Sequence, residues 1–116
     1  MPVERPRPPR APFDTGHPGD DAQLEAMAIE AHLVVPRRWT HFLHFAELTD
    51  ARAAMEILAA HWEVDLLASP DGTGWTVQPA RDDARLSALE VRKTRRELTA
   101  VAADHHGEYD GWRAWL

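Results

Sequence analysis

The chain of 116 residues contains no cysteine, and this absence excludes several kinds of chemistry. Without thiols the protein has no disulfide framework, no zinc site built on thiolates and no cysteine nucleophile. The absence also fits a reducing compartment, so we expect the protein to be cytoplasmic. No apolar run approaches the roughly 20 residues of a membrane-spanning helix, and the N-terminus lacks the apolar region of a signal peptide.

Glycine is scarce as well, with six residues, and none of them belongs to a phosphate-binding loop. Gly72 and Gly74 join two predicted strands, whereas such a loop leads into a helix. Ser69 and Ser87 are candidate nucleophiles, but neither has the glycine-flanked elbow of a hydrolase. We therefore predict that the protein is not an enzyme and binds no cofactor.

Seven histidines are present, yet their spacing does not favour a metal site. His41 and His44 are three residues apart in a predicted strand, so their side chains point to opposite faces. His105 and His106 are adjacent at a predicted helix end, where imidazole interacts with exposed carbonyl groups. Since no pair shows i, i+4 spacing with a carboxylate nearby, we predict no metal ligands.

The composition is that of a globular domain, with 44% apolar and 28% charged residues and a net charge of −6. Residues 1–20 carry balanced charges, so residues 21–116 hold the whole acidic excess. An acidic body disfavours binding to nucleic acid and suits a basic protein partner. The last helix carries a basic cluster, which we interpret as a solvated helix face: Arg92, Lys93, Arg95 and Arg96.

Residues 1–19 hold six of the nine prolines, and we predict a disordered or polyproline-like leader there. The run Pro6–Arg10 is similar to ligands of proline-recognition domains, and the alternative is a flexible leader without a specific role. Residues 20–116 are predicted to form one domain. Its elements are helix 22–32, strand 39–48, helix 49–61, strand 63–68, turn 69–74, strand 75–79, loop 80–86, helix 88–106 and strand 108–115.

Several local signals support these elements. Asp20 or Asp21 is the expected cap of the first helix, Thr49 that of the second, and Ser87 with Glu90 forms a capping box for the last. Gly107 is expected to end that helix with a positive φ. The first helix should bury an apolar face, and one face of the first strand should meet the core. The helix face consists of Leu24, Met27, Ala28 and Ala31. The strand face consists of Trp39, His41, Leu43 and Phe45.

The order of elements after the first helix predicts a ferredoxin-like α+β fold, βαββαβ. Its four-stranded antiparallel sheet would carry two helices on one face, and the helix at 22–32 would be an addition. We expect the first and last strands to lie side by side in the middle of the sheet.

The closing segment is the candidate site. Tyr109, Trp112 and Trp115 lie within seven residues, and Gly111 is a natural place for a bulge. We expect one of the two tryptophans to lie on the open sheet face, as in a protein-binding hot spot. Glu108 and Asp110 form a possible carboxylate pair, which we interpret as structural. The predicted protein-binding residues are Glu108, Tyr109, Asp110, Gly111, Trp112 and Trp115.

The run Glu108–Trp112 after a long helix resembles the RraB family, regulators of ribonuclease activity that inhibit ribonuclease E. The strand segment His41–Phe45, the alanine-rich helix after it and the hairpin support the resemblance, which covers residues 39–115. One departure is His61-Trp62, where the family usually has glycine and an aromatic residue. The resemblance implies a non-enzymatic ferredoxin-like domain that binds a ribonuclease or a degradosome-type scaffold component.

Two alternatives to this function are open. A small-molecule-binding or enzymatic ferredoxin-like dimer would enclose a pocket lined by His41 or His44 with Trp39. A structural module would use its sheet to dock another domain.

Overall fold

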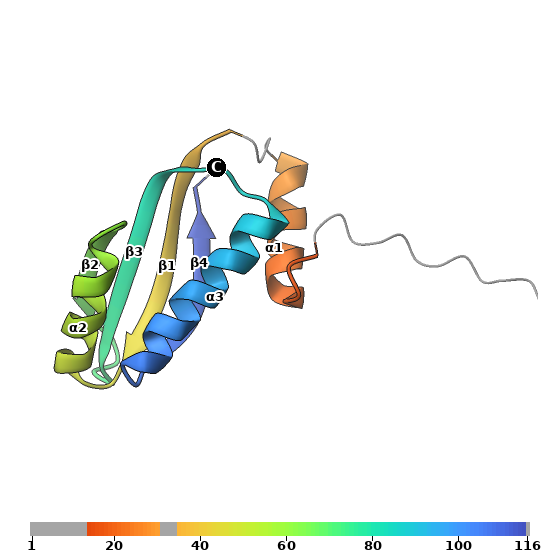
Figure 1. Ribbon diagram of the computed structural model, residues 1–116. Helices are drawn as coiled ribbons and strands as arrows, with labels where there is room; N and C mark the ends of the chain where they lie inside the picture. Colours follow the sequence, from red (N-terminus) through yellow and green to blue (C-terminus); the bar gives the residue numbers. More distant parts are fainter. Residues whose placement is uncertain (1–13, 31–34, 116) are drawn as a thin grey trace, which may run out of the picture.

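The computed structural model of the chain describes residues 14–30 and 35–115, and shows an α+β fold with three helices and one sheet. The predicted fold class is confirmed to that extent. The elements are α1 (Pro18–Glu30), β1 (Arg37–Phe45), α2 (Leu48–Leu58), β2 (Glu63–Ala68), β3 (Trp75–Ala84), α3 (Ala88–Asp104) and β4 (Glu108–Ala114). Figure 1 shows α2 and α3 over one face of the sheet, while α1 stands beside β4.

The strands follow the order β2-β3-β1-β4, and each neighbouring pair is antiparallel. The first and last strands are neighbours, as predicted, with His41 opposite Trp112 and Leu43 opposite Tyr109. The first strand lies in the middle of the sheet as expected, but the central place expected for the last strand was wrong, because β4 is an edge strand. The hairpin partner β3 pairs with the other side of β1, so β1 and β3 are the two central strands.

The core lies between the sheet and the helices that cover one of its faces. Alternation in β1 is confirmed: Trp39, His41, Leu43 and Phe45 are buried, and the residues between them are half-buried. Each large apolar side chain that leaves water there contributes about 1.5–3 kcal/mol. The helices and other strands complete the core with Leu24, Met27, Ala51, Ala54, Leu58, Trp62, Val77, Val91, Leu98, Ala102 and Trp112.

Helix α1 begins earlier than predicted, at Pro18, and neither Asp20 nor Asp21 caps it. The cap is His17, whose Nδ1 accepts a hydrogen bond from the Asp20 amide at 3.1 Å. Proline suits the position after a cap, since its ring presets φ and its missing N–H would have no helical partner. The two aspartates therefore lie inside the first turn.

The buried face of α1 also differs from the prediction. Leu24 and Met27 are buried, but Ala28 is exposed, and the buried residue one turn before Leu24 is Asp20. Ala31 and the predicted helix end lie outside the described residues. Thr15, part of the predicted leader, is buried and donates to Asp21 through its amide and hydroxyl at 2.8 and 2.6 Å. Residues 1–13 of that leader also lie outside the described residues.

Other boundaries shift by a few residues. β1 starts at Arg37 and ends at Phe45, so α2 starts at Leu48 after Glu47, and Thr49 is not its cap. β3 continues past Pro79 to Ala84, where a loop was predicted. The extension has a physical reason: because β1 starts early, the last residue of β3 pairs with Arg37. The predicted turn at 69–74 is confirmed, and the Ser69 amide donates to the Gly74 carbonyl at 2.9 Å.

Helix α3 begins as predicted, because Ser87 Oγ accepts from the Glu90 amide at 3.1 Å. Its end differs, since the residue with positive φ is His106, at 61°, and not Gly107. The amides of His106 and Gly107 donate to the carbonyls of Ala103 and Ala102, at 3.2 and 2.7 Å. This is a Schellman ending with histidine in the left-handed position.

Candidate protein-binding surface

The closing segment carries a β-bulge that controls where its aromatic side chains point. Tyr109 pairs with Leu43 and Gly111 with Phe42, so Asp110 is an extra residue in β4. Gly111 has a φ of 111°, which glycine tolerates better than any other residue. The predicted bend at Gly111 is confirmed. Because of it, Tyr109 and Trp112 both pack against the core although they are three residues apart.

Trp112 and Trp115 lie on opposite faces of the sheet, as the sequence predicted. Trp112 is 6% exposed beneath the helices, and its ring lies 5.8 Å from that of Trp39. Trp115 is 52% exposed, and the guanidinium of Arg113 stacks on its ring at 4.5 Å. The segment therefore contributes one tryptophan to the core and one to the surface.

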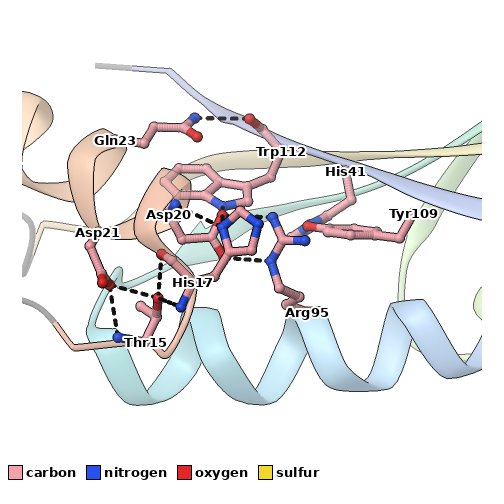
Figure 2. A network of polar contacts seen from close by, with 9 residues as sticks. All are labelled: Thr15, His17, Asp20, Asp21, Gln23, His41, Arg95, Tyr109 and Trp112. Atoms are coloured by element: carbon pink, nitrogen blue, oxygen red, sulfur yellow. Dashed lines mark hydrogen bonds and ion pairs between the residues drawn. The ribbon is translucent and has the colours of Figure 1, made fainter.

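An ion pair between a buried carboxylate and a half-buried arginine fixes the Trp112 ring and joins α1 to α3 (Figure 2). The Asp20 carboxylate accepts from Arg95 Nε at 2.5 Å, from Arg95 Nη2 at 2.8 Å and from Trp112 Nε1 at 2.9 Å. Burial alone would raise the pKa of Asp20, but the hydrogen bonds from Arg95 and Trp112 hold that pKa below its ordinary value. Arg95 was expected on the solvent side of its helix, and this was wrong.

Helix α1 also protects the outer side of β4. Gln23 Nε2 donates to the backbone carbonyl of Trp112 at 2.9 Å, as Figure 2 shows. An edge strand exposes unpaired backbone groups, and a helix laid beside it is one way to cover them. Helix α1 thus covers the edge that the closing segment forms.

The second polar contact of the segment joins His41 to Tyr109, with 2.7 Å between Nδ1 and Oη. His41 is fully buried, and the rings of Trp39 and Trp62 lie 4.2 and 5.2 Å from its own. Burial, with a smaller effect of the nearby Arg81, lowers the pKa of His41 to about 3. Burial also raises the pKa of Tyr109. Both side chains are therefore neutral at pH 7.

We expect His41 to make the stability of the domain fall as the solution is acidified below pH 7. Between its ordinary pKa of 6.5 and the folded value of about 3, the unfolded chain binds a proton that the folded protein does not. The free energy of unfolding should then drop by up to about 1.4 kcal/mol per pH unit in this window. Urea titrations at several pH values measure the slope.

The matched variants for this test are His41→Gln and His44→Gln. The first removes the buried imidazole and should flatten the slope, whereas the second changes a half-buried histidine on the opposite face and should keep it. An equal slope in the two variants would contradict the assignment to His41.

The sheet face opposite α2 and α3 carries the exposed part of the segment. There, β1, β2, β3 and the end of the chain surround a shallow depression of about 290 Å³. Its lining residues are Arg38, Thr40, Phe42, Asp65, Gln78, Ala80, Arg113 and Trp115. Arg38 is held in place through Nη1, which contacts Glu63 at 2.9 Å and Asp82 at 2.7 Å. We call this depression the Trp115 surface.

The structure divides the six predicted binding residues into two groups. Tyr109 and Trp112 face the helices, and Gly111 forms the bulge, so these three shape the segment from within. Glu108, Asp110 and Trp115 are exposed. The six predicted residues leave out Phe42, Arg38 and Arg113, which line the same depression as Trp115. Alternation along β1 puts Phe42 on the face opposite Trp39 and Leu43, and that was the available signal.

The other large depression lies on the helix-covered side and measures about 470 Å³. Trp39 lines it, together with His61 and Arg81, but neither His41 nor His44 does. This depression is therefore not the pocket, lined by His41 or His44 with Trp39, that a small-molecule-binding dimer would enclose between its sheets. No group of three metal-binding side chains comes together in residues 14–30 and 35–115.

The chain matches the family model RraB, regulator of ribonuclease activity B, over residues 21–113. The protein belongs to the RraB family. The match includes nearly all of α1, so the helix that covers β4 is part of the family's domain. Comparisons with curated proteins and with solved structures gave no match. RraB proteins are regulators of ribonuclease activity and not a known family of enzymes, as predicted from the resemblance. None of the described helices has the length and apolar character needed to cross a membrane.

Proposed function

We propose that this RraB-family protein modulates RNA degradation by direct contact with a ribonuclease of the ribonuclease E type, or with the scaffold that carries it. It does so without catalysis, and it acts in the cytoplasm. The observation that carries the proposal is an exposed tryptophan on the sheet face that none of the described helices covers, in a family of ribonuclease regulators.

We also infer that the arrangement is ferredoxin-like. The strand order β2-β3-β1-β4 and the placement of α2 and α3 over one face support this inference. In such a domain the second face of the sheet is available to a partner. α1 is then an addition that covers the β4 edge and leaves this second face open.

The chemistry of the Trp115 surface suits a protein partner. Tryptophan and arginine dominate binding hot spots, and Trp115 lies there with Arg113 stacked on its ring. Phe42 adds a half-buried aromatic side chain, and the ion pairs of Arg38 hold its guanidinium in a fixed position. Glu108 and Asp110 are exposed acids at the start of the segment, which favours a basic partner.

Substituting Trp115 with alanine should weaken the regulation of the ribonuclease at least tenfold, because a hot-spot tryptophan contributes about 2 kcal/mol or more to binding. The free energy of unfolding should change by less than about 0.5 kcal/mol, since half of the side chain is already in water. The assay follows RNA cleavage by the purified ribonuclease as the protein is titrated, and denaturant unfolding checks the fold.

Leu89→Ala is the matched control for this experiment. Leu89 is 66% exposed, and it lies on α3, which covers the opposite face. It should leave both regulation and stability unchanged. Cleavage rates that do not respond to the unaltered protein would refute the proposed function. Equal losses of regulation in the two variants would refute only the role of Trp115 and not the proposed function.

A further inference from the structure

The two edges of the sheet are treated differently by the fold. α1 covers β4 through Gln23 and Asp20, whereas β2 has β3 on one side and none of the described strands on the other. Within the described residues, no hydrogen bond reaches the outer backbone groups of β2. An uncovered edge is a template for an additional strand.

The ladder shows which groups point outward. The Ser69 amide donates to the Gly74 carbonyl, and this pair continues the β2–β3 register. In an antiparallel ladder, every second residue exchanges hydrogen bonds with the partner strand. Glu63, Asp65 and Leu67 therefore bond to β3, and the N–H and C=O groups of Val64, Leu66 and Ala68 point outward.

We propose that the outer edge of β2 accepts an extended basic segment of the protein partner as a fifth strand. This rests on the proposed function and names the kind of segment that the partner supplies. Three residues alternate along β2 with those whose backbone groups point outward, and their side chains are exposed: Glu63, Asp65 and Leu67. Glu63 is already paired with Arg38, while Asp65 has no ion pair with any described residue. A lysine or arginine opposite Asp65 and an apolar side chain opposite Leu67 complement this row.

A second copy of this chain fits the edge less well. In antiparallel pairing of two β2 strands, the acidic side chains of the two copies come to opposite or diagonal positions on one face. Each copy also carries a net charge of −6. Like charges this close are destabilising, so the charge of the edge selects a basic strand over self-association.

The edge also continues into the Trp115 surface, because Asp65 and Trp115 line the same depression. A segment that adds to β2 has its basic side chains on the sheet face where Trp115 is exposed. Backbone pairing at the edge and side-chain contact on the face can therefore belong to one interface.

The test uses the ¹⁵N-labelled full-length chain and follows amide hydrogen exchange and chemical shifts in β2. Two probes are added in separate experiments: the purified ribonuclease, and an eight-residue peptide that alternates lysine and valine. In the free protein, the amides of Val64, Leu66 and Ala68 should exchange faster than those of Asp65 and Leu67. Both probes should protect the three outward amides, and a peptide with glutamate in place of lysine should not.

Three variants separate charge from backbone pairing. Asp65→Lys should weaken binding of the lysine peptide by about tenfold or more, since it places like charges together. Ala68→Pro removes an outward N–H without removing a bond to β3, and should weaken binding similarly. Glu97→Lys makes the same charge change at an exposed site on α3, and should leave binding nearly unaltered. The spectra show directly whether Ala68→Pro keeps the fold.

Each outcome has a defined meaning. Protection of the outward amides by both probes supports the inference and the proposed function. A ribonuclease complex that protects other residues but not β2 overturns the inference and keeps the proposed function. Binding of the lysine peptide at β2 without a ribonuclease complex supports the edge site and overturns the proposed function. Absence of binding by both probes overturns both, and concentration-dependent protection without a probe shows that a second copy occupies the edge.

Discussion

Replacing Asp20 with alanine should destabilise the domain by about 3 kcal/mol, at the lower end of the range for breaking a buried ion pair, because the Arg95 side chain that remains is 24% exposed. The substitution leaves the Arg95 guanidinium and the Trp112 indole N–H without their acceptor. Asp20 itself is only 1% exposed. It also detaches the start of α1 from α3 and β4. Urea unfolding at pH 7 measures the loss.

Asp21→Ala is the matched control, because it removes the neighbouring carboxylate and the same net charge. Within the described residues the carboxylate of Asp21 is bonded only to Thr15, so we expect a loss of about 1 kcal/mol. The double variant Asp20→Ala with Arg95→Met should recover most of the stability lost by Asp20→Ala alone, since it leaves no unpaired charge. Equal losses for Asp20→Ala and Asp21→Ala would contradict the importance of the ion pair.

The ion pair adds to the acid sensitivity already attributed to His41. The folded pKa of Asp20 lies below its ordinary value, so its contribution is complete above that ordinary value and is lost as the pH falls through the folded one. Asp20 therefore contributes to acid unfolding at lower pH than His41 does. In the Asp20→Ala variant, the loss of unfolding free energy that Asp20 causes at the lowest pH values should disappear. The slope of unfolding free energy against pH that His41 causes should remain.

Features that depend on neighbouring residues were predictable from the sequence. The buried face of β1 follows from strict alternation, and Ser87 caps α3 because the capping box needs only a glutamate three residues later. The bulge at Gly111 was predicted from a glycine inside a strand pattern. In each case the physical cause lies within a few residues of the feature.

The Asp20–Arg95 pair was not predictable in this way, because its partners are 75 residues apart and both types are usually solvated. The predicted start and buried face of α1 relied on the spacing of apolar residues alone and ignored charged ones. For this reason the predicted start was too late, and Ala28 was wrongly placed on the buried face. The order of strands in the sheet is a further non-local property. Nothing near Glu108–Trp112 indicates that β3, and not β4, takes the second central position.

The same limit applies to the candidate site. Aromatic composition drew attention to the closing segment, but composition does not separate a ring that packs inward from one that is exposed. Strand alternation after the bulge places Trp112 and Trp115 on opposite faces, and the bulge brings Tyr109 to the same side as Trp112. The proposed binding surface combines Trp115 with residues of the strands beside it.

Gly107→Ala should destabilise the domain by about 3 kcal/mol, at the upper end of the range for inserting a methyl group into a packed site. A Cβ at this position would lie 2.5 Å from two carbons of the Phe45 ring and 2.6 Å from the His44 carbonyl oxygen. Phe45 is fully buried and cannot move aside, and the carbonyl belongs to the central strand. Thermal and urea unfolding should both show the loss.

The neighbouring substitution His106→Gly should have the opposite sign and stabilise the domain by about 0.5–1 kcal/mol. His106 is exposed and holds a φ of 61°, a conformation that an L-residue adopts at a cost and glycine adopts freely. If Gly107 itself required the positive φ, as the sequence suggested, His106→Gly would only add chain entropy to the unfolded state and would destabilise. The sign of the change in the free energy of unfolding therefore shows why position 107 is glycine. Stabilisation means that Gly107 is needed for close packing, and destabilisation means that it is needed for a positive φ.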